Sequence, residues 1–136
     1  MEEAPSITYS RDEINGIYEL GKLYFEMGFF VPAERIFSGI LAVDDGFAAA
    51  RLALGLLRIE RGLVQEGIQQ LRELLQSGSY AVEARLGLCL AFLSLDDVPR
   101  AQTLVAELRG EIDASGGQAA AVKQLWEALE MRCSNG

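Results

Sequence analysis

Apolar and small side chains recur along this chain at one fixed spacing. The step from Gly21 to Gly55 is 34 residues, and the same step leads on to Cys89. The apolar sets that share this phase are Leu20, Leu54 and Leu88; Phe37, Leu71 and Val105; and Ile40, Leu74 and Leu108. A second small-residue set is Ala33, Gly67 and Ala101. A fixed period in this range predicts a stack of supersecondary units.

Within each period the apolar positions follow helical spacing. One stripe, at i, i+1, i+4 and i+5, consists of Ile36, Phe37, Ile40 and Leu41. Ser10 and Glu13 have the form of a capping box, which predicts a helix that begins at about Arg11. Gly28 permits the left-handed backbone that would end this helix. We expect helices over 11–27, 32–43, 47–61, 64–76, 80–95, 99–111 and 118–132, with a linker at 113–117.

The first period carries a complete family pattern. It consists of Leu20-Gly21, Tyr24, Gly28, Phe30, Ala33 and Phe37. This pattern resembles the tetratricopeptide repeat, and the resemblance places units at 14–47, 48–81 and 82–115. The later units match less fully, because Arg58 and Phe92 replace Tyr24, and Cys89 and Asp96 replace two glycines. A generic array of helical hairpins is the alternative.

The resemblance implies an all-α fold, in which antiparallel helical hairpins stack as a right-handed solenoid of about seven helices. We expect a disordered N-terminus at 1–9 and three repeats within 10–115. A C-terminal capping helix is expected at 116–133, with Trp126 at the Tyr24 position, followed by a disordered tail at 134–136. Such a cap would cover the core face of the last unit.

Charge and hydropathy exclude several classes of function. The net charge is −8 and the basic residues are scattered, which disfavours nucleic acid and anionic membranes as partners. Gly, Arg and Glu break the longest apolar runs, so we expect no membrane insertion. The start Met1-Glu2-Glu3 has no apolar stretch behind it, which argues against a secretory signal and favours a cytoplasmic location.

Candidate catalytic groups are scarce. The chain has no histidine, which removes the commonest general base and metal ligand. Cys89 and Cys133 lie far apart, and neither a disulfide framework nor a zinc site is predicted. The pairs Asp44-Asp45 and Asp96-Asp97 lie where helices start or stop, which is typical of caps. We therefore expect no enzyme activity and no cofactor.

In tetratricopeptide repeats the first helix of each unit lines a concave groove. By this resemblance the groove-facing residues are Asn15, Tyr18, Lys22, Phe25 and Glu26; Ala49, Leu52, Leu56, Ile59 and Glu60; and Glu83, Leu86, Leu90, Leu93 and Ser94. Most are apolar, unlike the basic clamp that holds acidic C-termini of heat-shock chaperones. Either the chain's own last helix or an apolar partner segment would fill such a trough. Phe29 is expected to point outward, as a contact at the edge.

The stretch from Ala33 to Ile68 is similar to the chaperones of type III secretion translocators. The matching residues are Ala33, Phe37, Leu41, Val43-Asp44, Leu54-Gly55-Leu56, Arg58, Gly62 and Ile68. This resemblance implies a passive chaperone, whose groove sequesters a hydrophobic helix or extended segment of an export substrate. The long N-terminal extension used for dimerisation in that family is largely absent, which leaves homodimer and heterodimer open. The alternative function is a scaffold or adaptor subunit of an unrelated complex.

Overall fold

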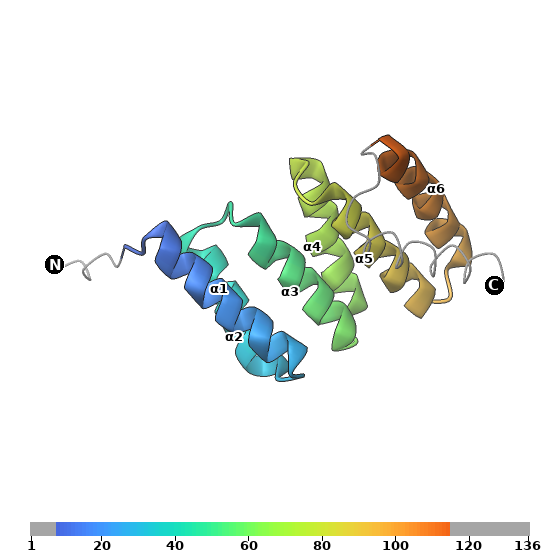
Figure 1. The fold of residues 1–136 in the computed structure, drawn as a ribbon. Coiled ribbons are helices and arrows are strands. Elements are labelled where there is room, and N and C mark those ends of the chain that lie inside the picture. The colour runs from blue at the N-terminus through green and yellow to red at the C-terminus, as the bar shows by residue number, and fades with distance from the viewer. Residues whose placement is uncertain (1–7, 115–136) are drawn as a thin grey trace, which may run out of the picture.

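The computed structural model describes residues 8–114, and within this range every regular element is a helix. The helices are α1 (Arg11–Glu26), α2 (Phe30–Val43), α3 (Ala48–Glu60), α4 (Val64–Ser77), α5 (Ala81–Ser94) and α6 (Val98–Ala114). Each packs against the next in sequence, and the three hairpins stand side by side in one row (Figure 1). The predicted all-α stack of hairpins is confirmed. The predicted seventh helix at 116–133 and the tail at 134–136 lie outside the described residues.

Three helices end in the same way, one in each unit. The backbone N–H of Phe29 donates to the carbonyl of Tyr24, at 2.9 Å between nitrogen and oxygen. The equivalent bonds, from Leu63 to Arg58 and from Asp97 to Phe92, are each 2.8 Å long. This is the bond pattern of the Schellman motif, which needs a left-handed residue just before the donor.

Two glycines and one aspartate supply that left-handed residue. Gly28 and Gly62 both have a φ of +83°. Asp96 takes the same place in the third unit with a φ of +57°. Aspartate tolerates this region better than most residues with a side chain. The apparent break in the sequence pattern at Asp96 therefore leaves the turn intact.

The predicted start of the first helix is also confirmed. The N–H of Glu13 donates to the Ser10 hydroxyl, and the N–H of Ser10 donates to the Glu13 carboxylate, both at 3.1 Å. The aspartate pairs do cap turns and helices, because Asp44 accepts from the N–H of Gly46 and Asp97 accepts from the N–H of Arg100.

Two predicted boundaries are wrong. Residues 113 and 114, which we expected to begin a linker, belong to α6. Tyr9, which we assigned to the disordered N-terminus, is half-buried and packs against the core of the first unit. The single glycine near this end of α6, Gly110, does not break the helix, and the ring of Tyr9 lies on an apolar surface beside Ile14.

The recurring small residues lie where paired helices approach closely. A Cβ atom placed on Gly21 would stand 2.7 Å from the ring of Phe37. One placed on Gly67 would stand 2.7 Å from the carbonyl oxygen of Gly55 on the facing helix. The Cys89 thiol, fully buried, lies 3.8 Å from the carbonyl oxygen of Ala101. The period of small residues is thus a consequence of helix packing.

The hydrophobic core consists of two clusters that share α3. The first comprises Ile14, Ala33, Phe37, Ile40, Phe47, Ala50, Leu54 and Leu57. The second comprises Ile68, Leu71, Leu74, Ala84, Leu86, Leu88, Cys89, Ala91, Phe92, Ala101, Val105 and Leu108. Three α3 side chains, Ala48, Leu52 and Ile59, also pack against the second cluster. Helix α3 therefore joins the first hairpin to the rest of the molecule.

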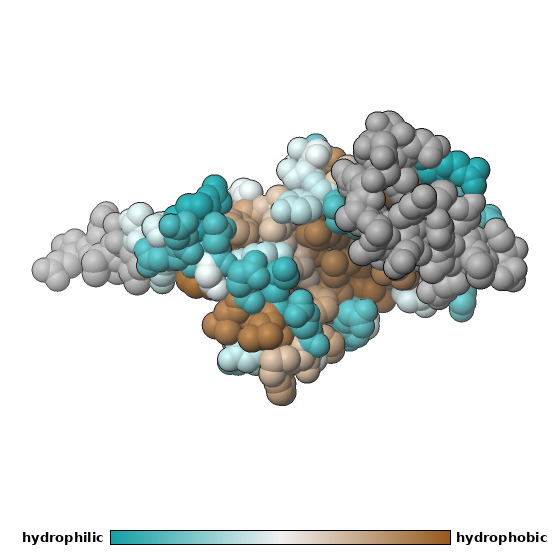
Figure 2. All heavy atoms as spheres, viewed as in Figure 1, coloured by the Kyte–Doolittle hydropathy of each residue, from teal (hydrophilic) through white to brown (hydrophobic). Residues whose placement is uncertain are grey.

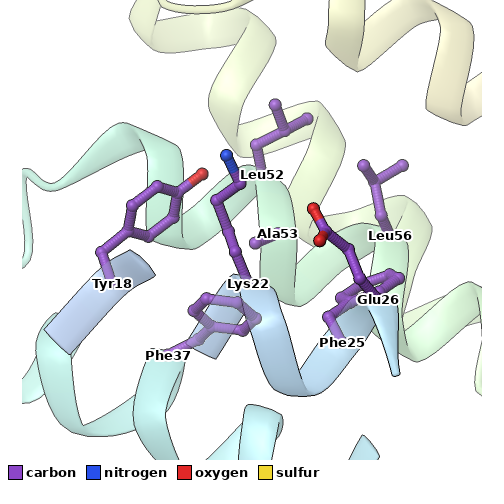
Figure 3. Close-up of a pocket in the computed structure, with 8 residues that line it drawn as sticks. All are labelled: Tyr18, Lys22, Phe25, Glu26, Phe37, Leu52, Ala53 and Leu56. Atoms are coloured by element: carbon purple, nitrogen blue, oxygen red, sulfur yellow. The ribbon is translucent and has the colours of Figure 1, made fainter. Parts of the chain in front are cut away.

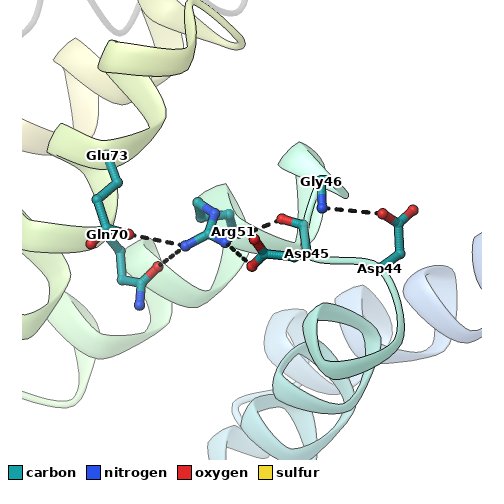
Figure 4. Close-up of polar contacts among 6 residues, drawn as sticks. All are labelled: Asp44, Asp45, Gly46, Arg51, Gln70 and Glu73. Carbon is teal, nitrogen blue, oxygen red and sulfur yellow. Dashed lines mark hydrogen bonds and ion pairs between the residues drawn. The ribbon is translucent and has the colours of Figure 1, made fainter.

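A polar link also joins the units. The guanidinium of Arg51 donates to Asp45 at 2.8 Å, to Gln70 at 3.2 Å and to Glu73 at 3.0 Å (Figure 4). One side chain on α3 thus connects the α2–α3 turn to α4. No helix in the described range is long and apolar enough to cross a membrane.

Candidate protein-binding groove

The first helices of the three units enclose two adjoining cavities. The first has a volume of about 250 Å³ and is lined by Tyr18, Lys22, Phe25, Glu26, Phe37, Leu52, Ala53 and Leu56. Figure 3 shows its α1 side chains pointing toward Leu52 and Leu56 of α3. The second has a volume of about 480 Å³ and is lined by Phe25, Leu56, Ile59, Glu60, Leu90 and Ser94.

Phe25 and Leu56 line both cavities, so the two cavities lie side by side. We use "the groove" for the residues of these two cavities. It runs from α1 across α3 to α5, and its floor is mainly aliphatic and aromatic. Figure 2 shows hydrophobic side chains gathered over the middle of the viewed face, beside the hydrophilic row over α1.

Helical periodicity on α1 directs four side chains to the groove. Tyr18, Lys22, Phe25 and Glu26 are spaced three or four residues apart and so share one face. The Tyr18 ring packs between Phe37 and Phe47, with ring centroids 5.9 and 5.6 Å away. Phe25 meets Phe30 edge-to-face, at 5.8 Å between centroids. Aromatic neighbours of this kind hold the two groove-lining rings in place.

Polar groups stand at the α1 edge of the groove. The Lys22 ammonium lies 5.8 Å from the centroid of the Tyr18 ring and 3.8 Å from the Glu19 carboxylate. Burial raises the pKa of the Tyr18 hydroxyl, and the negative charge of Tyr80 and Glu19 raises it further. Tyr18 is therefore a neutral hydrogen-bonding group near pH 7, next to a cation that has a carboxylate partner.

The structure brings together ten of the fifteen residues that the family resemblance assigned to the groove. Those that line a cavity are Tyr18, Lys22, Phe25, Glu26, Leu52, Leu56, Ile59, Glu60, Leu90 and Ser94. Leu93 is half-buried against the second core cluster and lines neither cavity, while Asn15 is exposed outside both. The prediction that Leu86 faces the groove is wrong, because only 4% of this residue is exposed and it belongs to the second core cluster.

Two lining residues were missed. Ala53 is one position away from an assigned residue, and Phe37 belongs to α2, the second helix of its unit. Phe37 reaches the groove because Gly21 leaves room for its ring between the two helices. The glycine at position 21, opposite the large ring of Phe37, was the available signal, but the repeat pattern assigned Phe37 to packing alone.

Phe29, the predicted edge contact, lies outside the groove. It is 51% exposed and follows directly on the turn that ends α1. Its ring meets Tyr24 edge-to-face, at 6.3 Å between centroids. Phe29 is therefore held in a fixed position on the outside of the first hairpin.

The lining of the groove is suited to apolar contacts. Among the described residues no group of three or more His, Cys, Asp or Glu side chains could hold a metal ion. Glu26 and Glu60 are the carboxylates that line the groove, each in a different cavity. A segment with apolar side chains a few residues apart would fit this arrangement.

Comparison with solved structures identifies proteins that have the same fold. No protein-family model matches the chain, and no curated protein matches it either. The structure of PcrH from Pseudomonas aeruginosa superposes with a TM-score of 0.80 and 20% sequence identity, covering 94% of each chain. The chain shares this helical-repeat fold.

A second solved structure has the same fold. SycD from Yersinia enterocolitica, a type III secretion translocator chaperone in an alternative dimer, superposes with a TM-score of 0.71 and 18% identity. The match covers 90% of this chain and 96% of SycD. At such low identity the likeness extends to the fold, and function has to be argued from the groove.

Proposed function

We propose that this protein is a type III secretion chaperone that holds an apolar segment of an export substrate in the groove. The observation that carries the proposal is that the two cavities lie side by side and share Phe25 and Leu56. A single hydrophobic trough across three repeats fits one client segment several residues long. The fold shared with SycD supports the same assignment.

The energetics suit a firm but reversible complex. The leucines, Ile59 and Phe25 in the groove are half-buried, so each keeps apolar surface that a client would remove from water. Complete burial of such a side chain contributes about 1.5–3 kcal/mol, and the exposed half correspondingly less. Several of them together would offset the cost of ordering a flexible client segment.

The proposed mechanism is passive, without turnover or cofactor. A client segment that aggregates when free would be kept soluble and unassembled until it is handed over. The net charge of −8 helps keep such a complex in solution, and it favours clients with basic residues beside the apolar ones. We place this activity in the cytoplasm, where export substrates are synthesised.

The test is capture of a client from the native cell by tagged protein, with Leu56→Glu as the variant. Leu56 lines both cavities, so a carboxylate there would put a charge against any apolar segment in the groove. We expect recovery of the client to fall at least about tenfold, which corresponds to about 1.4 kcal/mol. Circular dichroism should show that the variant remains helical.

Leu95→Glu is the matched control. Leu95 is 44% exposed at the α5–α6 turn and lines neither cavity, so this variant should capture the client as the unmodified protein does. If Leu56→Glu also captures it fully, the groove is not the client site. Recovery of several folded partners, insensitive to Leu56→Glu, would instead support a scaffold or adaptor.

A further inference from the structure

The first hairpin carries a further cavity, between α1 and α2, which we call the hairpin pocket. Its volume is about 200 Å³, and it shares no lining residue with the two cavities of the groove. Most of its lining is apolar, and Val43 at its edge is 51% exposed. The lining residues are Tyr9, Ile14, Ile17, Arg35, Ile36, Gly39, Ile40 and Val43.

A salt bridge joins the two helices of each later unit. The Arg51 guanidinium lies 3.0 Å from the Glu73 carboxylate and so links α3 to α4 (Figure 4). The Arg85 guanidinium lies 3.1 Å from the Glu107 carboxylate and links α5 to α6. The step from one arginine to the other is one period, as is the step between the glutamates. This bridge therefore follows the repeat.

The hairpin pocket lies where the first unit lacks this bridge. One period before Arg51 stands Ile17, and one period before Glu73 stands Gly39. Both line the pocket, so an apolar side chain and an absent one take the places of the cation and the anion. No side chain or other helix of the described chain comes within 4 Å of a Cβ placed on Gly39. Contacts within the described chain therefore do not account for this glycine, which lowers the stability of a helix interior.

Arg35 adds an unpaired cation to the rim of the hairpin pocket. It is exposed, and within residues 8–114 its guanidinium makes no hydrogen bond, ion pair or cation–π contact. The same position holds Gln69 in the second unit and Thr103 in the third, so the charge is particular to the first unit. A guanidinium forms strong, directed hydrogen bonds with a carboxylate. An apolar pocket with this rim therefore fits a ligand that joins an apolar group to a carboxylate.

We propose that the hairpin pocket is a docking site for an acidic-apolar segment of a second protein. One large apolar side chain of that segment enters beside Ile17 and Gly39, and a neighbouring aspartate or glutamate pairs with Arg35. The volume is below the range of about 300–1,000 Å³ that whole small molecules occupy, which suits one side chain of a short motif. Since the groove stays free, one copy of the chain can hold a client and this partner together.

The test uses defined peptides and the full chain. The probe is the tripeptide Glu-Leu-Glu, acetylated and amidated at its ends, with Gln-Leu-Gln and Glu-Ala-Glu as matched probes. Binding is followed by the NMR shift of the Gly39 amide at about 0.15 M salt, which screens the net charge of the protein. We expect a dissociation constant on the order of millimolar for Glu-Leu-Glu, because so short a motif offers few contacts. Each matched probe should bind at least about threefold more weakly.

Two variants assign the binding to the hairpin pocket. Arg35→Gln should remove the difference between Glu-Leu-Glu and Gln-Leu-Gln. The double variant Ile17→Arg, Gly39→Glu installs the bridge of the later units, and it should abolish binding of Glu-Leu-Glu while the protein remains folded. Leu56→Glu in the groove should leave binding of the probe unchanged.

Three results would overturn the proposal. They are no saturable shift with Glu-Leu-Glu, equal binding of Glu-Leu-Glu and Gln-Leu-Gln, and binding that persists in the folded double variant. Binding that appears only after removal of residues 1–7 would also overturn it, because the chain's own segment would then be the occupant. The proposal is independent of the groove, since client capture responds to Leu56→Glu and probe binding responds to Arg35→Gln.

Discussion

Gly67 illustrates how one atom can decide the stability of a helix pair. Alanine normally stabilises a helix interior by about 1 kcal/mol relative to glycine. At Gly67 the added Cβ would lie 2.6 Å from Cγ1 of Ile59 and 2.7 Å from the backbone oxygen of Gly55. A backbone atom cannot rotate away, so we expect Gly67→Ala to lower the free energy of unfolding by about 1–2 kcal/mol. Urea denaturation followed by circular dichroism measures this.

Gly39 provides the opposite case on α2. No heavy atom lies within 4 Å of a Cβ placed there, and the residue is exposed. Gly39→Ala should therefore raise the free energy of unfolding by about 0.5–1 kcal/mol. Equal effects of the two substitutions would mean that helix propensity, and not interhelical contact, decides at both sites.

Ionisation of Tyr18 should lower the free energy of unfolding at alkaline pH. Burial, with the added effect of Tyr80 and Glu19, raises the pKa of its hydroxyl above the ordinary value. A raised folded-state pKa contributes stability that is complete below the unfolded pKa, about 10, and is lost as pH rises through the folded pKa. The free energy of unfolding should thus fall as pH rises through and above the unfolded pKa of about 10.

Replacement of this hydroxyl tests the cause of the alkaline loss. Tyr18→Phe keeps the ring between Phe37 and Phe47 but cannot ionise, so its unfolding free energy should fall less over the same pH range. Urea midpoints at about pH 8 and pH 10.5 give the comparison. A loss of the same size in both proteins would assign the effect to other groups.

At the scale of the element, helix boundaries were predictable where a capping signal was specific. Ser10 and Glu13 fixed the start of α1, and Gly28 fixed its end. The continuation of α6 to Ala114 was not predictable in the same way. The linker was assigned from composition, but neither Gly110 nor Asp113 is a specific stop signal, and both belong to the helix.

Contacts between elements depend on side chains whose partners lie far along the chain, and Arg51 is the clearest example. Its side chain is 18% exposed and pairs with carboxylates on two different elements. Arg51→Met would keep the aliphatic stem and leave Asp45, Gln70 and Glu73 without this donor. We expect the free energy of unfolding to fall by about 1–2 kcal/mol, measured by urea denaturation.

Arg100 is the control for the loss of a guanidinium. It is 67% exposed and pairs with Asp97, three residues earlier on the same chain segment. Arg100→Met should cost less than about 1 kcal/mol, the usual size of an exposed pair. If both substitutions cost the same, the links made by Arg51 across units do not add stability.

For the whole molecule, the period of 34 residues was enough to predict the order and pairing of the helices. It also placed most of the groove, because residues of one helix face follow from helical spacing. It could not place Leu86 or Phe37. Whether a groove-facing leucine stays open depends on the approach of neighbouring helices, and Phe37 reaches the groove through space left by another helix.

The two core clusters support different sides of the groove. Tyr18 and Phe25 pack against the first cluster, while Ile59 and Leu90 pack against the second. The two sides of the groove therefore rest on different cores, joined through α3. The width of the groove depends on how firmly this one helix holds the clusters together.

The exposure of Leu20, beside the burial of Leu54 and Leu88, also makes the molecule a modular building block. Each unit carries the surface for a preceding unit, and in the first unit that surface is already formed. A helical hairpin copied from residues 48–77 and grafted ahead of Ser10 would meet the kind of contact that α4 makes with α5. The array could in this way be lengthened by engineering, with a longer groove as the product.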